Sequence, residues 1–158
     1  MLLCWTAGKA SPIHDHPCDG CWMRCIEGGI TETRYAMPSQ DTTALIQTAE
    51  GTFSSPSVAY IDDNCGLHKV AAAGDGPAIT MHLYAPPYTQ CRVWLHPEDA
   101  QRVLRPVVTF FSEHGKIVTY DAPHCAASAE RSASSEEQQS KAIASICDLE
   151  PTAATPAH

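Results

Sequence analysis

Positive charge is scarce in this sequence. The 158 residues include 10 Lys and Arg against 18 Asp and Glu, which gives a formal net charge of −8. A chain this acidic does not track a phosphate backbone, so we expect no nucleic-acid partner. Long apolar runs are also lacking, because no stretch approaches the roughly 20 residues that cross a bilayer. We therefore expect no membrane association either.

A secretion signal is not evident. The opening stretch MLLCW is too short for the apolar core of a signal peptide, and no basic residues flank it. The eight cysteines are therefore expected to be reduced, buried or functional, and not a disulfide framework. The sequence predicts a soluble, cytoplasmic protein whose length suits one domain with a real core.

Short β-rich runs dominate the first three quarters of the chain. Gly20 to Gly29, GCWMRCIEGG, alternates in character, with Cys21, Met23 and Cys25 on one face. The turn signal EGG and the β-rich run after it predict a hairpin over residues 20–37. The other expected strands are MLLCW, which looks buried, SVAYID, PAITMHLYA and a hairpin within VVTFFSEHGKIVTY that turns at EHGK. Many short strands predict an all-β antiparallel barrel or sandwich.

Three other segments are less defined. Residues 38–51 are polar and fit a short helix or a loop, and residues 96–104, HPEDAQRVL, fit a short helix or a long turn. From about Ala122 the chain is rich in Ala, Ser and Glu. We expect a barrel domain over residues 1–121 and a disordered, low-complexity tail over residues 122–158.

Metal-ligating residue types crowd into residues 11–22, SPIHDHPCDGCW. On a strand, His14 and His16 point to the same side, as two imidazoles must to hold one metal ion. Cys18 and Cys21 also spell CxxC, so a zinc knot or a redox dithiol is an alternative. A surface pair of histidines is the third interpretation.

The spacing around this cluster favours the metal site. It is similar to the first cupin motif, in which a glycine, an HxH pair, a glutamate and a second glycine follow at fixed intervals. Gly8, His14, His16 and Gly28 occupy the matching positions, and Cys21 stands where the glutamate would be. Further along, NCGLHKV offers His68 as a third ligand.

A second polar row lies in the run PAITMHLYA. Thr80, His82 and Tyr84 alternate with apolar residues, so one face of the expected strand is polar. Such a row on a barrel strand faces either solvent or a wet cavity, and the sequence alone leaves both open.

Taken together, SPIHDH, Cys21, GLHKV and HLYAPPYTQC resemble a eukaryotic-type cysteine dioxygenase over roughly residues 2–120. The resemblance implies a cupin barrel (a jelly-roll-like double-stranded β-helix) that binds one mononuclear non-haem Fe(II). It also implies these roles: His14, His16 and His68 as iron ligands, Cys21 and Tyr84 as a thioether pair, His82 and Thr80 as supports of the tyrosine hydroxyl, and Cys91 near the pocket.

The implied reaction converts L-cysteine and O2 to cysteine sulfinic acid, in cysteine catabolism towards hypotaurine and taurine or sulfite, with no organic cofactor. Three neutral histidines leave the full charge on the metal, which favours binding of a thiolate. Two alternatives stay open: a dioxygenase of another small thiol, such as cysteamine, and a metal-binding cupin without catalysis.

The match is incomplete at the N-terminus. The family carries a segment before the first strand whose arginine and tyrosine grip the substrate carboxylate, and this sequence has no counterpart, so we expect a truncated or short form. Family members are monomers, but barrel surface exposed here predicts self-association. Substitutes for the missing arginine are sought among Arg24, Arg34, Lys69 and Arg92.

Overall fold

The computed structural model describes residues 1–119, and within these residues it contains β-strands and no helix. The strands are β1 Leu2–Trp5, β2 Ile13–His14, β3 Gly20–Glu27, β4 Gly29–Tyr35, β5 Gln47–Ser54, β6 Val58–Ile61, β7 Leu67–Ala72, β8 Ala78–Ala85, β9 Val93–Trp94, β10 Ser112–Glu113 and β11 Lys116–Ile117. One compact unit, Met1–Val108, contains β1 to β9, and a second unit begins at Thr109.

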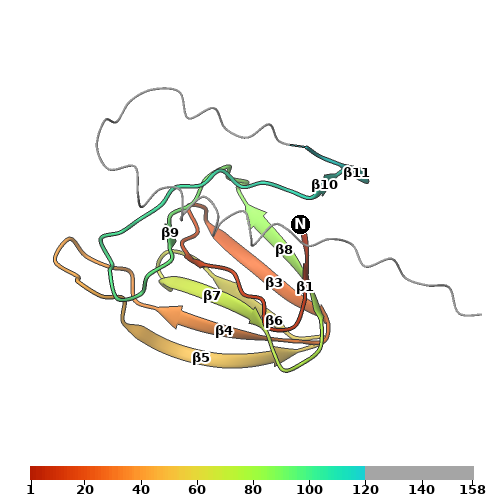
Figure 1. Cartoon of the computed structure of the whole chain (residues 1–158), viewed down its shortest axis with the longest axis horizontal. Helices are drawn as coiled ribbons and strands as arrows, with labels where there is room; N and C mark the ends of the chain where they lie inside the picture. The colour runs from red at the N-terminus through yellow and green to blue at the C-terminus, as the bar shows by residue number, and fades with distance from the viewer. Residues whose placement is uncertain (120–158) are drawn as a thin grey trace, which may run out of the picture. The chain divides into compact units, whose positions relative to one another are not determined.

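Two antiparallel sheets make up the first unit (Figure 1). One has the strand order β1-β8-β3-β6, and the other has the order β5-β4-β7-β2-β9. A buried cluster joins them: Trp5 and Met23 come from the first sheet, and Ile30 and Val70 come from the second. The all-β prediction is thus confirmed, and the architecture is consistent with a cupin barrel. The predicted tail and the domain boundary at residue 121 lie outside the described residues.

A second cluster fixes the strands that carry the histidines. It forms on the opposite face of the five-stranded sheet, where Ile13 of β2, Leu67 of β7 and Trp94 of β9 are buried together. The Trp94 indole N–H also donates to the Ala100 carbonyl at 2.9 Å. β2 and β7 are therefore held on one face by apolar packing, which leaves their other face to present polar side chains to the interior.

The hairpin predicted over residues 20–37 is wrong. β3 pairs with β6 and β8, whereas β4 pairs with β5 and β7, so the chain changes sheet at Gly28 and Gly29. Gly28 has φ +68°, and a Cβ there would clash with the Pro77 carbonyl oxygen. A hairpin would place the two strands side by side, but Met23 and Ile30 instead meet face to face in the core.

The two undecided segments resolve differently. Residues 96–104 form turns with no helix, and residues 47–51 begin β5, which the sequence reading missed. β5 is an edge strand with mostly exposed side chains, so its polar composition hid it. The expected hairpin at EHGK is confirmed as β10 and β11, with positive φ at His114 and Gly115.

The outer face of the four-stranded sheet exposes many apolar side chains, and Arg24 of β3 lies among them in register with Met81 and Val58. Side chains alternate along each strand, so those opposite the core point outward. The opening strand is therefore not buried as predicted: Trp5 is 9% exposed, but Leu2 is 63% exposed. We call the exposed apolar side chains on this sheet the outer apolar face: Leu2, Trp22, Ile26, Val58, Tyr60, Met81 and Leu83.

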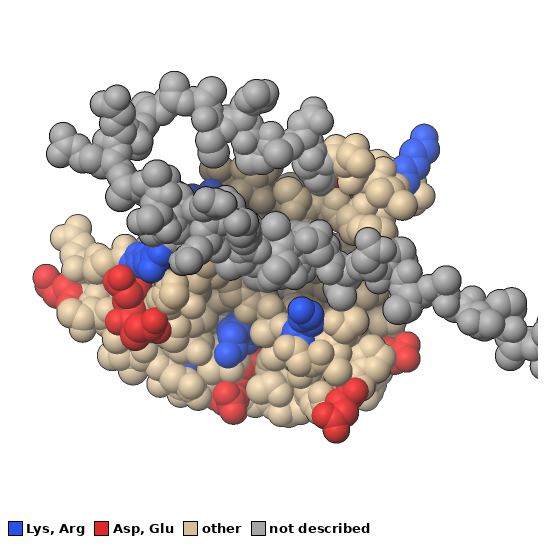
Figure 2. Space-filling model, in the orientation of Figure 1, with Lys and Arg blue, Asp and Glu red and all other residues tan. Residues whose placement is uncertain are grey.

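Charged residues are spread over the visible surface. In Figure 2 the blue Lys and Arg side chains do not merge into one basic surface, and red Asp and Glu side chains lie around them. No helix in residues 1–119 is long and apolar enough to cross a membrane.

Candidate metal centre

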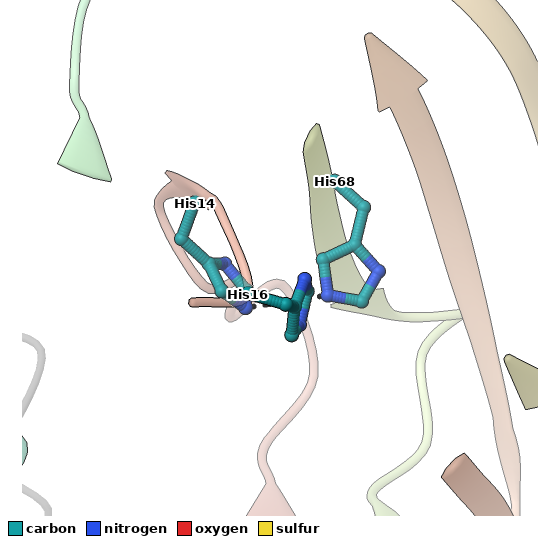
Figure 3. A group of neighbouring side chains, drawn as sticks. All are labelled: His14, His16 and His68. Atoms are coloured by element: carbon teal, nitrogen blue, oxygen red, sulfur yellow. Dashed lines mark hydrogen bonds between the residues drawn. The ribbon is translucent and has the colours of Figure 1, made fainter. Parts of the chain in front are cut away.

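Three imidazoles converge between the two sheets. His14 and His68 are register partners on the neighbouring strands β2 and β7, and His16 lies two residues after the end of β2. One ligand atom of each residue lies within 4.8 Å of the others. Figure 3 shows the three rings with ring nitrogens turned towards one another. Among residues 1–119, this is the group of His, Cys, Asp and Glu side chains that could hold a metal ion.

Hydrogen bonds fix which nitrogen of two rings is free. His14 Nδ1 lies 3.0 Å from the Pro12 carbonyl oxygen, and His68 Nδ1 lies 2.7 Å from a carboxylate oxygen of Glu32. Both oxygens can only accept, so each Nδ1 carries the proton and donates. Each Nε2 then presents a lone pair, and the two Nε2 atoms face each other at 3.2 Å.

That separation suits a shared ion. Two ligand nitrogens bound at about 2.1 Å and about 90° to 109° apart lie about 3.0 to 3.4 Å from each other. Without a cation or a shared proton, two facing lone pairs at this distance would repel. The pair His14 and His68 therefore fits two ligands of one metal.

His16 supplies an independent observation. Its side chain is 1% exposed, yet neither ring nitrogen has a hydrogen-bond partner. Buried polar atoms without a partner are rare because each one costs free energy. A metal ion would give one of these two nitrogens a partner, and imidazole suits iron, zinc, copper and nickel.

The histidines are held neutral. Burial lowers the pKa of His16 to about 2, with the nearby His14 and His68 adding to the effect. Burial also lowers the pKa of His14 and brings the pKa of His68 well below its usual value. Neutral imidazole is the form that binds metal, so the site needs no deprotonation step near neutral pH.

A hydrogen-bonded row runs along the inner face of β8. The Trp5 indole donates to Thr80 Oγ1 at 2.8 Å, and Thr80 Oγ1 lies 2.8 Å from His82 Nε2. The indole only donates, so the Thr80 hydroxyl proton goes to His82 Nε2. His82 Nδ1 then carries the proton, and it faces the Tyr84 hydroxyl at 3.4 Å and Cys21 Sγ at 3.8 Å.

Burial also shifts the pKa values of two residues in this row. It lowers the pKa of His82 to about 4 and raises the pKa of the Tyr84 phenol. Of the two options left open by the sequence, the row faces the interior: Thr80 and His82 are buried, whereas Met81 and Leu83 are exposed.

Cys21 and Tyr84 are neighbours across strands. They are register partners on β3 and β8, and both point inward. Directly opposite residues have Cβ atoms about 4.5 to 5.5 Å apart. Burial raises the pKa of the Cys21 thiol to about 12. The Tyr84 ring lies 6.3 Å from His16, centroid to centroid, which joins this pair to the histidines.

The CxxC alternative receives no support from the geometry. Cys18 and Cys21 are both free thiols, and the Cys18 thiol donates to the Gly20 carbonyl at 3.4 Å. The candidate metal group contains no cysteine. Cys91 lines a cavity of about 180 Å³ together with Asp15 and Pro17, which flank His16, but none of the three histidines lines this cavity.

The four cations suggested as carboxylate clamps are placed as follows. Arg34 pairs with Glu32, and Arg92 pairs with Asp15. Arg24 lies on the face of β3 opposite Cys21, and Lys69 lies on the face of β7 opposite His68.

Sequence reasoning missed three residues at the site. Glu32 and Trp5 reach it from strands distant in the chain, and no local motif marks them. Tyr88 packs edge-on against Tyr84, with ring centroids 5.1 Å apart. Its place in APPYTQC, four residues after Tyr84, was the available signal.

Comparison with known proteins decides the family. A family model described as "Cysteine dioxygenase type I" matches residues 1–96. The chain belongs to the cysteine dioxygenase type I family. Proteins named cysteine dioxygenase type 1 are similar over most of it: the Bos taurus protein is 33% identical over 116 residues, covering 73% of this chain and 57% of that protein.

Two further relatives agree. The Rattus norvegicus protein is 36% identical over 95 residues, which cover 60% of this chain and 48% of that protein. The Danio rerio protein is 30% identical over 123 residues, which cover 77% of this chain and 60% of that protein. The chain thus spans about half the length of the curated relatives it matches.

Proposed function

We propose that this chain binds Fe(II) through His14, His16 and His68 and oxidises L-cysteine with O2 to cysteine sulfinic acid. One observation carries the proposal: three neutral imidazoles aim ring nitrogens at one point in a chain of the cysteine dioxygenase type I family. In His14 and His68 the Nδ1 atom is committed to a hydrogen bond, and neither ring nitrogen of His16 has a hydrogen-bond partner.

The donor set suits this chemistry. When bound, Fe(II) would supply a Lewis-acidic and redox-active centre suited to the oxidation of a thiolate by O2. Neutral ligands leave the metal charge uncompensated, which favours the anionic thiolate. Transfer of both oxygen atoms to sulfur balances the reaction without an outside electron donor and yields the sulfinic acid.

Residues of the four-stranded sheet orient the reactants. His82 Nδ1–H points at the Tyr84 hydroxyl and holds it in place, and Trp5 and Thr80 fix the His82 ring from behind. Because its pKa is raised, Tyr84 stays a neutral phenol whose hydroxyl can donate to a bound substrate. A fixed donor lowers the entropy cost of positioning.

We also propose a thioether bond between Cys21 Sγ and the Tyr84 ring. Its formation removes one hydrogen from each residue, and O2 accepts the two electrons and two protons. The cross-strand register of the two residues supports it. Intact-mass measurement after incubation with Fe(II), cysteine and O2 should show a species about 2 Da lighter than the unmodified chain. Cys21→Ser and Tyr84→Phe should each keep the unmodified mass.

A thiol without a carboxylate is the second candidate substrate. The observation that favours it is the engagement of Arg34 and Arg92 in ion pairs with Glu32 and Asp15. A charged hydrogen bond contributes about 1.5 to 3 kcal/mol, so a substrate that needs no such contact loses nothing here. Cysteamine is the natural comparison.

The free thiols fit the cytoplasmic location that forms part of this proposal. All six cysteines in residues 1–119 are unpaired, as expected in a reducing compartment. The product would then enter cysteine catabolism towards hypotaurine and taurine or sulfite.

The test is oxygen uptake by the Fe(II)-loaded 158-residue chain, with sulfinate quantified in parallel for L-cysteine and for cysteamine. We expect one O2 consumed per sulfinate formed from L-cysteine, and no turnover by His16→Ala. Faster turnover of cysteamine would shift the assignment to the second substrate. Bound iron without any sulfinate would reduce the function to metal binding. A chain that binds no iron would refute both candidate reactions, that of L-cysteine and that of cysteamine.

A further inference from the structure

A buried carboxylate stands behind one of the three histidines. Glu32 lies on β4 and is only 3% exposed. Its register partner on β7 is Val70, and Arg34, two residues on, is the partner of His68. The side chains of Glu32 and Arg34 therefore share the inner face of the sheet with His68. A carboxylate this buried is costly unless both oxygens are satisfied.

Both oxygens are satisfied, and by different partners. Oε1 lies 2.7 Å from His68 Nδ1, and Oε2 accepts from Arg34 Nε at 2.9 Å. Arg34 in turn donates through Nη2 to the Tyr60 carbonyl oxygen at 2.8 Å. Tyr60 belongs to β6 in the other sheet, so the chain of contacts runs from one sheet to the imidazole.

We infer that Glu32 is a positioning residue for the metal centre, and that Arg34 holds Glu32 in place. The carboxylate keeps the proton of His68 on Nδ1, fixes the ring plane and directs the Nε2 lone pair at the common point. Partners of this kind behind a ligating imidazole also raise its basicity and typically contribute 10- to 100-fold in metal affinity. The inference rests on the proposed metal site.

The three histidines differ in this respect, which makes the role specific. His14 Nδ1 meets a backbone carbonyl, and His16 has no partner on either nitrogen. Only His68 of these three is backed by an ionisable side chain. We therefore expect His68 to be the strongest donor of the set, and changes at Glu32 to act through this one ligand.

Titration of the metal-free chain with Co(II), followed by its visible absorption, tests the inference. Glu32→Gln keeps an acceptor oxygen but removes the charge, so we expect the Co(II) dissociation constant to rise about 10-fold. Glu32→Ala removes both, and the rise should approach about 100-fold. Arg34→Met leaves the carboxylate without its second partner and should fall between the wild-type chain and Glu32→Ala.

Glu50→Gln is the matched control. Glu50 lies on β5, is exposed, and accepts a hydrogen bond from the Thr33 hydroxyl at 3.0 Å. This substitution also removes one carboxylate from the same sheet, but it should leave the Co(II) dissociation constant unchanged. Urea unfolding of each variant separates weaker binding from loss of structure.

A second readout follows the proton itself. Nitrogen-15 NMR of the metal-free chain should show His68 protonated on Nδ1 in the wild type and in Glu32→Gln, and a mixture of tautomers in Glu32→Ala. A purely structural role of Glu32 would not move this signal. If Glu32→Ala does not fold, Glu32→Gln and Arg34→Met decide the question by Co(II) affinity.

The outcomes separate the two proposals. If the wild-type chain binds neither Co(II) nor Fe(II), the proposed function fails. If it binds the metal and the Glu32 and Arg34 variants bind with the same affinity, the role assigned to Glu32 is overturned and the proposed function stands.

Discussion

Three buried histidines with lowered pKa make the stability of the metal-free chain depend on pH. His16, His68 and His82 are each 5% exposed or less, and their folded-state pKa values lie below the ordinary 6.5. The unfolded chain therefore takes up protons before the folded chain does. The contribution of the neutral histidines to the free energy of unfolding is fully present above about pH 6.5, the pKa in the unfolded chain. It is lost as the pH falls towards the pKa values in the folded chain, about 4 for His82 and about 2 for His16.

The free energy of unfolding should fall by up to about 1.4 kcal/mol per histidine for each pH unit below about pH 6.5. Urea unfolding of the metal-free chain at about pH 7 and about pH 5.5 measures it. His16→Gln should make the dependence shallower, whereas His96→Gln should not, because His96 is an exposed side chain on a loop. Equal midpoints at the two pH values in the wild type would contradict the prediction.

At this scale the sequence is informative where a motif is local. HxH and GLH are short strings, so the residues that form the histidine cluster were predictable from spacing. Glu32 and Trp5 were not, because their partners His68 and Thr80 are 36 and 75 residues away and only the strand pairing brings them together.

At the scale of elements, Gly66 sets the start of β7 and so the position of His68. It has φ +106°, and a Cβ there would clash with the Tyr35 carbonyl oxygen. We expect Gly66→Ala to destabilise the fold by about 2 to 4 kcal/mol, from backbone strain plus the clash, and to weaken metal binding. Urea unfolding and Co(II) titration measure the two effects.

Gly74→Ala provides the comparison for that variant. Gly74 also has a left-handed φ, +69°, but a Cβ there would meet nothing within 4 Å. It should cost only about 1 kcal/mol and leave Co(II) binding unchanged. Equal losses in the two variants would show that the close approach at Gly66 contributes nothing.

Strands were easier to predict than their pairing. The alternation in β3 and β8 follows from side-chain period and was correct, but only the structure shows that the faces with Cys21 and Tyr84 are the inner ones. The link between β3 and β4 looked like a hairpin because a glycine turn is a local signal. Which sheet each strand joins depends on burying Met23 against Ile30, which no local pattern encodes.

At the scale of the whole molecule, the sequence predicted the all-β class because strand-forming runs recur along the chain, and it could not predict the two-sheet topology. It also suggested exposed barrel surface, and the structure identifies the outer apolar face. Exposed apolar side chains grouped around Arg24, on a sheet whose ends are the edge strands β1 and β6, favour association with another sheet.

We expect this 158-residue chain to self-associate through the outer apolar face. Met81 and Leu83 are 44% and 61% exposed at its centre, on β8 between β1 and β3. Replacing both with Thr keeps β propensity and removes apolar area from the face. Sizing chromatography with light scattering should show a mass above that of a monomer for the wild type, and this mass should rise with concentration. The double variant should be a monomer.

Ile46→Thr is the control, because it changes a comparably exposed residue (64%) outside this sheet, and this variant should still associate. A wild-type monomer at every concentration would contradict the prediction, because the apolar face would then be stable in water without a second copy.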